Sequence, residues 1–158
     1  PLYSSAASDV YKRQYLSMLI SFLCWGYFVP KFSKNINDAI RWLKFGAPIN
    51  LIVLAIIIYL GPKAGSIHWA IFIVSSIFLS LAHPAVGMAF SLSNAGKALT
   101  SFNLLLFIGA FFMQWVMGLI IDAGMSLNLS EINSFKLAMI FVLITSLFSY
   151  LFFIIKKK

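Results

Sequence analysis

The sequence predicts an all-α protein, a polytopic transmembrane helical bundle with five spans, and three observations lead to that class. Of its 158 residues, 61% are hydrophobic and 10% are charged, whereas soluble chains carry about 25% charged residues. Apolar stretches approaching the roughly 20 residues that cross a bilayer recur along the chain. Short polar gaps separate these stretches and hold most basic residues. The net charge of +8 therefore fits membrane topology, and no nucleic-acid partner is expected.

The first fourteen residues differ from the rest of the chain in their expected origin. Residues 4–14 read SSAASDVYKRQ, and their back-translation resembles a common sequencing-library adapter with its transposon end. We therefore expect residues 1–14 to be translated adapter that is not part of the native fold. Residues 15–158 are then expected to be the C-terminal transmembrane region of a longer protein. The alternative is a short polar N-terminus that belongs to the protein.

The first predicted span covers about 15–29, because the residue before Pro30 is biased away from helical geometry. A basic loop follows, and its second part, 36–43, has the spacing of a short interfacial helix. The second span covers about 45–60. Pro48 falls in its first turn, where a missing N–H donor costs little.

The third predicted span covers about 68–90, and Pro84 should kink it. Residues 91–96 contain turn-forming Asn and Gly and predict a turn. The fourth span covers about 98–121.

The fifth span covers about 135–155, with Ser130 or Asn133 as its N-cap. Five spans leave no room for a separate soluble domain.

Basic residues alternate between the two sides of the predicted membrane. One side holds Lys31, Lys34, Arg41, Lys44, Lys97 and the lysines at 156–158, and the other holds Lys63, Lys136, Asp122 and Glu131. The positive-inside rule puts the first set in the cytoplasm. We expect a multi-pass protein of the bacterial inner (plasma) membrane with a cytoplasmic C-terminus.

Two amide side chains in the fourth span are candidates for contact with a polar solute. Asn103 and Gln114 are eleven residues apart, about three helical turns, so they share a face with Phe107 and Ala110. This face predicts either a cavity wall or hydrogen bonds between packed helices. Gly109, Ala110 and Gly118 would allow close helix packing.

A second candidate face lies on the third span. Ser76, Ser80, His83 and Gly87 follow one another at spacings of four, three and four residues, which places them on one side of a helix. His83 is the only titratable group predicted deep within a span, and its ordinary pKa near 6.5 suits proton coupling. The alternative is a neutral histidine bonded to backbone groups that Pro84 leaves free.

The sequence has no metal-ligand spacing of Cys and His, no Gly-rich phosphate loop and no convincing Ser/His/Asp set. We therefore expect no cofactor, no metal and no enzymatic activity. A membrane-embedded enzyme with His83 as base and a non-transporting assembly subunit are the alternatives.

The segment 82–122, AHPAVGMAFSLSNAGKALTSFNLLLFIGAFFMQWVMGLIID, resembles helices ten and eleven of bacterial major facilitator superfamily transporters. The family's loop motif, G-x-x-x-D-[RK]-x-G-[RK]-[RK], is matched in part by Gly26, Lys31 and Lys34. Other positions of the motif differ, with Pro30, Ser33 and Asn35 in place of its acidic, glycine and last basic residues.

This resemblance implies that the five spans correspond to helices eight to twelve of a secondary transporter. It further implies alternating access for a small solute, with the missing N-terminal helices of the same protein as partner. It would turn Ser21 or Trp25, Ser80 or His83, and Asn103 or Gln114 towards the solute. The second and fifth spans would be peripheral.

Overall fold

In the computed structural model, every regular element of the described residues is a helix; these residues are 12, 15–16, 18–20, 22–29, 31 and 33–155. Four segments are long and apolar enough to cross a membrane, namely Ile36–Lys63, Ser66–Ala89, Leu92–Ser126 and Glu131–Ile155. A shorter apolar helix covers Met18–Val29. The all-α class and the presence of several spanning helices are confirmed. The predictions for residues 1–14 (Lys12 excepted), Ser21 and 156–158 lie outside the described residues.

Helix α2 (Ile36–Leu60) is longer than the predicted second span. It begins where the Asn35 side chain accepts a hydrogen bond from the N–H of Asp38 at 2.9 Å, which is an N-cap. The stretch predicted as a short helix at 36–43 is helical, but it is continuous with the second span instead of separate from it. Gly61, with φ of 54°, ends the helix, and η1 (Gly61–Lys63) follows.

Pro48 lies in the interior of α2, so the prediction of a first-turn proline is wrong. A proline in a helix interior leaves the carbonyl four residues earlier without its N–H donor. Here that carbonyl belongs to Lys44, and the hydroxyl of Tyr150 donates to it at 2.9 Å. A side chain of α6 thus replaces the bond that the proline removes.

Tyr150→Phe is expected to destabilise the protein by about 1 kcal/mol, because it leaves the Lys44 carbonyl without this donor. Thermal unfolding in detergent would measure the change. Tyr59→Phe is the matched control, since the Tyr59 side chain is 84% exposed. Equal melting temperatures for the two variants would contradict the role given to Tyr150.

The third spanning segment consists of three helical pieces. These are α3 (Ser66–Ser76), the 3-10 turn η2 (Ile77–Leu81) and α4 (Ala82–Ala89). The irregular residues thus precede Pro84 instead of being centred on it. The reason is that a proline disturbs the turn on its N-terminal side, where it cannot bond to the Ser80 carbonyl.

Helix α5 (Leu92–Ser126) begins earlier and ends later than the predicted fourth span. The predicted turn at 91–96 is wrong, because the chain turns at Phe90–Ser91 and the N–H of Asn94 already bonds to the carbonyl of Ser91 at 2.8 Å. Asn94 and Gly96 therefore lie in the first turns of α5.

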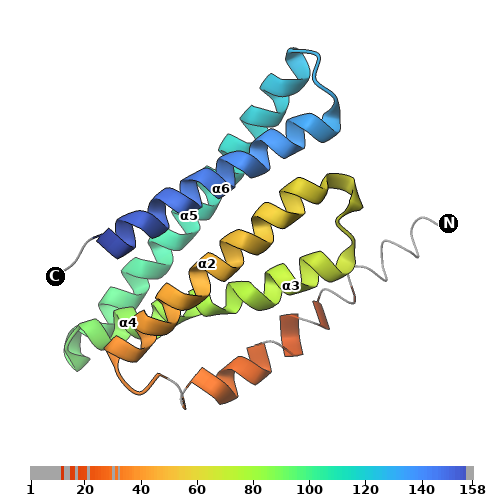
Figure 1. Ribbon diagram of the computed structural model, residues 1–158. Helices are drawn as coiled ribbons and strands as arrows, with labels where there is room; N and C mark the ends of the chain where they lie inside the picture. The colour runs from red at the N-terminus through yellow and green to blue at the C-terminus, as the bar shows by residue number, and fades with distance from the viewer. Residues whose placement is uncertain are drawn as a thin grey trace.

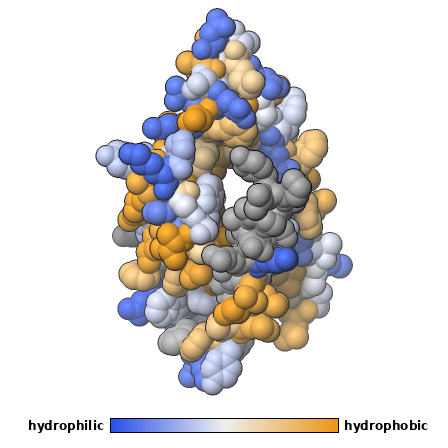
Figure 2. All heavy atoms as spheres, turned by 90° about the vertical axis from the view of Figure 1, so that its right-hand side faces the viewer, coloured by the Kyte–Doolittle hydropathy of each residue, from blue (hydrophilic) through white to orange (hydrophobic). Residues whose placement is uncertain are grey.

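Helix α6 (Glu131–Ile155) follows a short turn in which Asn128 has a φ of 60°. The hydroxyl of Ser130 accepts a hydrogen bond from the N–H of Asn133 at 3.3 Å. Ser130 is therefore the N-cap, and the alternative cap, Asn133, lies inside the helix. At the turn between α5 and α6, hydrophilic residues lie beside the exposed Leu127 and Leu129, and this end is at the top of the view in Figure 2.

The helices pack as two hairpins, α2 with α3 and α5 with α6, which meet through α2 and α6 and through α4 and α5 (Figure 1). Helix α2 contacts α3, η2, α4 and α6 and carries most of the buried side chains of the described part. In these residues α2 is central, whereas the resemblance implied a peripheral second span. The starts of α2 and α5 and the ends of α4 and α6 lie at one end of the bundle.

Candidate functional site

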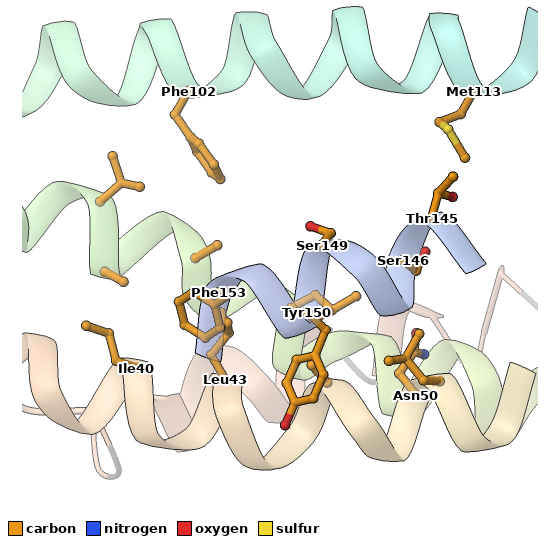
Figure 3. Close-up of a pocket in the computed structure, with 16 residues that line it drawn as sticks. Ile40, Leu43, Asn50, Phe102, Met113, Thr145, Ser146, Ser149, Tyr150 and Phe153 are labelled. Atoms are coloured by element: carbon orange, nitrogen blue, oxygen red, sulfur yellow. The ribbon is translucent and has the colours of Figure 1, made fainter. Parts of the chain in front are cut away.

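An open cleft of about 690 Å³ lies between the two hairpins, and α2, η2, α4, α5 and α6 all contribute to its wall (Figure 3). Most of the wall is apolar, and the larger contributors are Ile40, Leu43, Leu51, Phe102, Met113 and Phe153. Phe102 and Met113 point from α5 into the space above α6. No charged side chain lines this cleft among the described residues.

The polar groups of the cleft come mainly from one stretch of α6. Thr145 and Tyr150 are already bonded, Thr145 to the backbone carbonyls of Phe141 and Val142 at 2.9 and 3.0 Å and Tyr150 to Lys44. The hydroxyls of Ser146 and Ser149 form no hydrogen bond with other described residues. In Figure 3 the Ser149 hydroxyl points towards α5. The cleft therefore offers two hydroxyl groups on a neutral, mostly apolar wall.

Asn50 is a polar residue of the cleft that the sequence analysis did not identify. Its amide donates to the Phe72 carbonyl at 3.1 Å and to the Ser75 hydroxyl at 2.9 Å, and Ser75 donates to Phe72 at 2.8 Å. Both side chains are buried. This network joins α2 to α3, as amides commonly do between membrane helices. An amide within the otherwise apolar 45–60 stretch was the signal that could have identified it.

Two of the predicted site residues, Trp25 and Ser80, are hydrogen-bonded to each other. The indole N–H of Trp25 donates to the Ser80 hydroxyl at 2.8 Å, and this hydroxyl donates to the Ile77 carbonyl at 2.7 Å. The Trp25 ring also packs edge-on against Phe78, with 5.3 Å between centroids. These contacts attach the helix at Met18–Val29 to η2.

His83 and Asn103 form a second pair, which joins α4 to α5. Nε2 of His83 lies 3.0 Å from Oδ1 of Asn103. In this arrangement Nε2 is the donor, because a carbonyl oxygen only accepts. The His83 ring also packs edge-on against Phe102 at 5.0 Å. The partner of His83 is thus a side chain of α5, whereas the alternative prediction was a backbone group near Pro84.

The remaining predicted site residues lie neither in these two pairs nor in the cleft. The Ser76 hydroxyl donates to its own helix, at the Ile73 carbonyl at 2.7 Å. Gln114 is exposed and bonds to no other described residue. None of Trp25, Ser76, Ser80, His83, Asn103 and Gln114 lines the cleft. The sequence therefore identified residues of two interhelical pairs without predicting either pairing, and the cleft residues of α6 were missed.

The loop-motif residues Gly26, Lys31 and Lys34 are exposed, and the Lys31 ammonium lies 3.8 Å from the centroid of the Tyr27 ring. The small residues Gly109 and Gly118 do not mediate close packing, since no described atom would lie within 4 Å of a Cβ there. Close packing occurs at Gly46, against Phe78, and at Gly124, against Ser134.

The fold and the cleft define a polytopic helical membrane protein with an uncharged cleft between two hairpins. No family model, curated protein or solved structure matches this chain.

Proposed function

We propose that the chain is the C-terminal part of a secondary transporter that moves a small solute by alternating access. The observation that carries this proposal is the cleft between the two hairpins, in which two available serine hydroxyls interrupt a neutral, apolar wall. Pockets of this kind bind small molecules through apolar contacts and a few oriented polar groups.

Helix arrangement supports the same proposal. The cleft lies where hairpin α5–α6 meets α2 and α4, so a tilt of one hairpin against the other would open one end of the cleft and close the other. Transporters commonly work by such rocking around a central site. The resemblance of 82–122 to major facilitator helices favours this class over an enzyme or an assembly subunit. In the complete protein, the helices that precede this chain would pack beside these two hairpins.

Charge suggests the orientation. Lys34, Arg41, Lys44 and Lys97 belong to the end where α2 and α5 begin, and Lys63, Asp122, Glu131 and Lys136 belong to the other. By the positive-inside rule the first end faces the cytoplasm of an inner (plasma) membrane. The absence of charge in the described lining of the cleft favours an uncharged solute with at least one hydrogen-bonding group.

The test uses a single cysteine in the cleft of the complete protein. With Cys24→Ser and other cysteines removed, Ser149→Cys is expected to react with a membrane-impermeant maleimide added from either side of the membrane. Alternating access exposes the cleft to each side in turn, so both labelling reactions should proceed. Mass spectrometry of sealed vesicles of either orientation would measure them.

Leu147→Cys is the matched control, because Leu147 is on the same helix, is 45% exposed and does not line the cleft. Because it lies outside the cleft, it should remain unlabelled from both sides. Labelling of Ser149→Cys from neither side or from one side alone would contradict alternating access through this cleft.

A further inference from the structure

The exposed side of α2 changes sharply from basic to apolar. Its first turns expose Arg41 and Lys44, and Lys34 is exposed just before the helix. From the next residue onward the exposed positions are all apolar or aromatic and recur at spacings of four and three, which is one helical stripe: Phe45, Ile49, Ile52, Ile56 and Tyr59. This change places a boundary between water and hydrocarbon at Lys44–Phe45.

The cations at this boundary lack an acidic partner. Arg41 and Lys44 are three residues apart, so they are neighbours on the helix surface. Among the acidic residues of the described chain, Asp122 and Glu131 belong to the opposite end of the bundle, and the half-buried Asp38 forms no ion pair with either cation. The Lys44 ammonium instead lies 5.8 Å from the centroid of the Phe153 ring. Both charges are therefore available to an external anion.

The stripe has the length that a lipid requires. One leaflet of the hydrocarbon core is about 15 Å thick, which is roughly ten residues of helix. From Lys44 this distance covers Phe45, Ile49 and Ile52, whose side chains are 59%, 36% and 59% exposed. An acyl chain beside these residues would place its phosphate at Arg41 and Lys44.

The geometry points to a binding site for one anionic phospholipid on α2, with its phosphate held by Arg41 and Lys44 and an acyl chain lying along Phe45, Ile49 and Ile52. Lys34 adds positive charge at the headgroup level. Basic residues beside a membrane helix attract anionic headgroups. The apolar stripe beneath them offers contact to an acyl chain, which a free anion does not have. The site is independent of the proposed transport function, since it lies outside the cleft.

Lipid binding to the purified chain in a neutral detergent would test this site, by native mass spectrometry with dioleoylphosphatidylglycerol and dioleoylphosphatidylcholine as probes. We expect phosphatidylglycerol to bind more tightly. The Arg41→Gln/Lys44→Gln variant should bind phosphatidylglycerol about thirtyfold more weakly, the loss expected for two surface cations. Its weak binding of phosphatidylcholine should not change.

Lys63→Gln/Lys136→Gln is the matched control, because it removes two cations from the opposite end and should leave phosphatidylglycerol binding unchanged. Phe45→Ser/Ile52→Ser keeps both cations and tests the apolar stripe, and it too should weaken binding. Far-UV circular dichroism would verify that each variant stays helical. The proposal would be overturned if the two lipids bound with equal affinity, or if the control variant lost as much affinity for phosphatidylglycerol. It would also be overturned if soluble glycerol phosphate competed as strongly as the lipid itself.

Discussion

Gly46→Ala is expected to destabilise the protein by about 3 kcal/mol, the upper part of the range for overpacking a tight contact. A Cβ at this position would overlap Cβ and Cγ of Phe78. These atoms lie next to the η2 backbone and cannot swing away as the end of a long side chain could. Helix α2 and η2 would have to separate, and the edge-on contact between Phe78 and Trp25 would be disturbed with them.

Reversible unfolding in mixed micelles would measure this effect. Gly109→Ala is the matched control, because no described atom lies near its Cβ position and alanine is the better helix former. A Gly46→Ala protein as stable as Gly109→Ala would show that this crossing tolerates a methyl group.

Gly124→Val is expected to lower the free energy of unfolding by about 2–3 kcal/mol, because the added side chain would overpack the contact between α5 and α6. A Cβ on Gly124 would lie 2.7 Å from the Ser134 hydroxyl oxygen and 3.3 Å from the Ser134 Cα. Ser134 is fully buried, and its hydroxyl already donates to the Ser130 carbonyl at 3.1 Å. The side chain therefore has little room in which to move.

The loss at Gly124 should appear as a lower midpoint in the same unfolding experiment. Gly118→Val, on the same helix but with open space around its Cβ position, should change the midpoint little. Equal midpoints for the two valine variants would mean that α5 and α6 do not depend on close packing at Gly124.

Helix type and the approximate spans could be predicted from the sequence because hydropathy alone decides which segments prefer lipid. The ends of the helices could not. The short helix predicted at 36–43 and the span predicted at 45–60 form one continuous helix, α2, which begins after the Asn35 N-cap. Likewise Asn94 and Gly96 are residue types that favour turns, although a bend at Phe90–Ser91 lets α5 begin before them.

The polar residues predicted to share one face of the third span lie on different sides of it, and the reason is geometric. A 3-10 turn advances about 120° per residue and an α-helix about 100°, so the five residues of η2 rotate α4 by roughly 100° relative to a continuous α-helix. Ser76 and His83 therefore cannot share the side that their spacing implied. Ser76 bonds to its own helix, while His83 reaches Asn103 on α5.

The cleft itself was missed because its polar groups are hydroxyls in a strongly apolar helix. Ser146 and Ser149 barely change the hydropathy of 135–155, and their relation to α2 and α5 depends on how hairpins far apart in the sequence pack. A search for serines three residues apart on one span would have found the pair without showing what they face.

The length of helix α5 determines how far its two ends would move if the helix tilted. Its 35 residues contain no proline and extend about 52 Å, well beyond a hydrocarbon core of about 30 Å. It is therefore long enough to reach the headgroup layers on both sides, whereas the neighbouring segment is divided into α3, η2 and α4. A tilt of about ten degrees about the midpoint would move the two ends by roughly 4–5 Å in opposite directions.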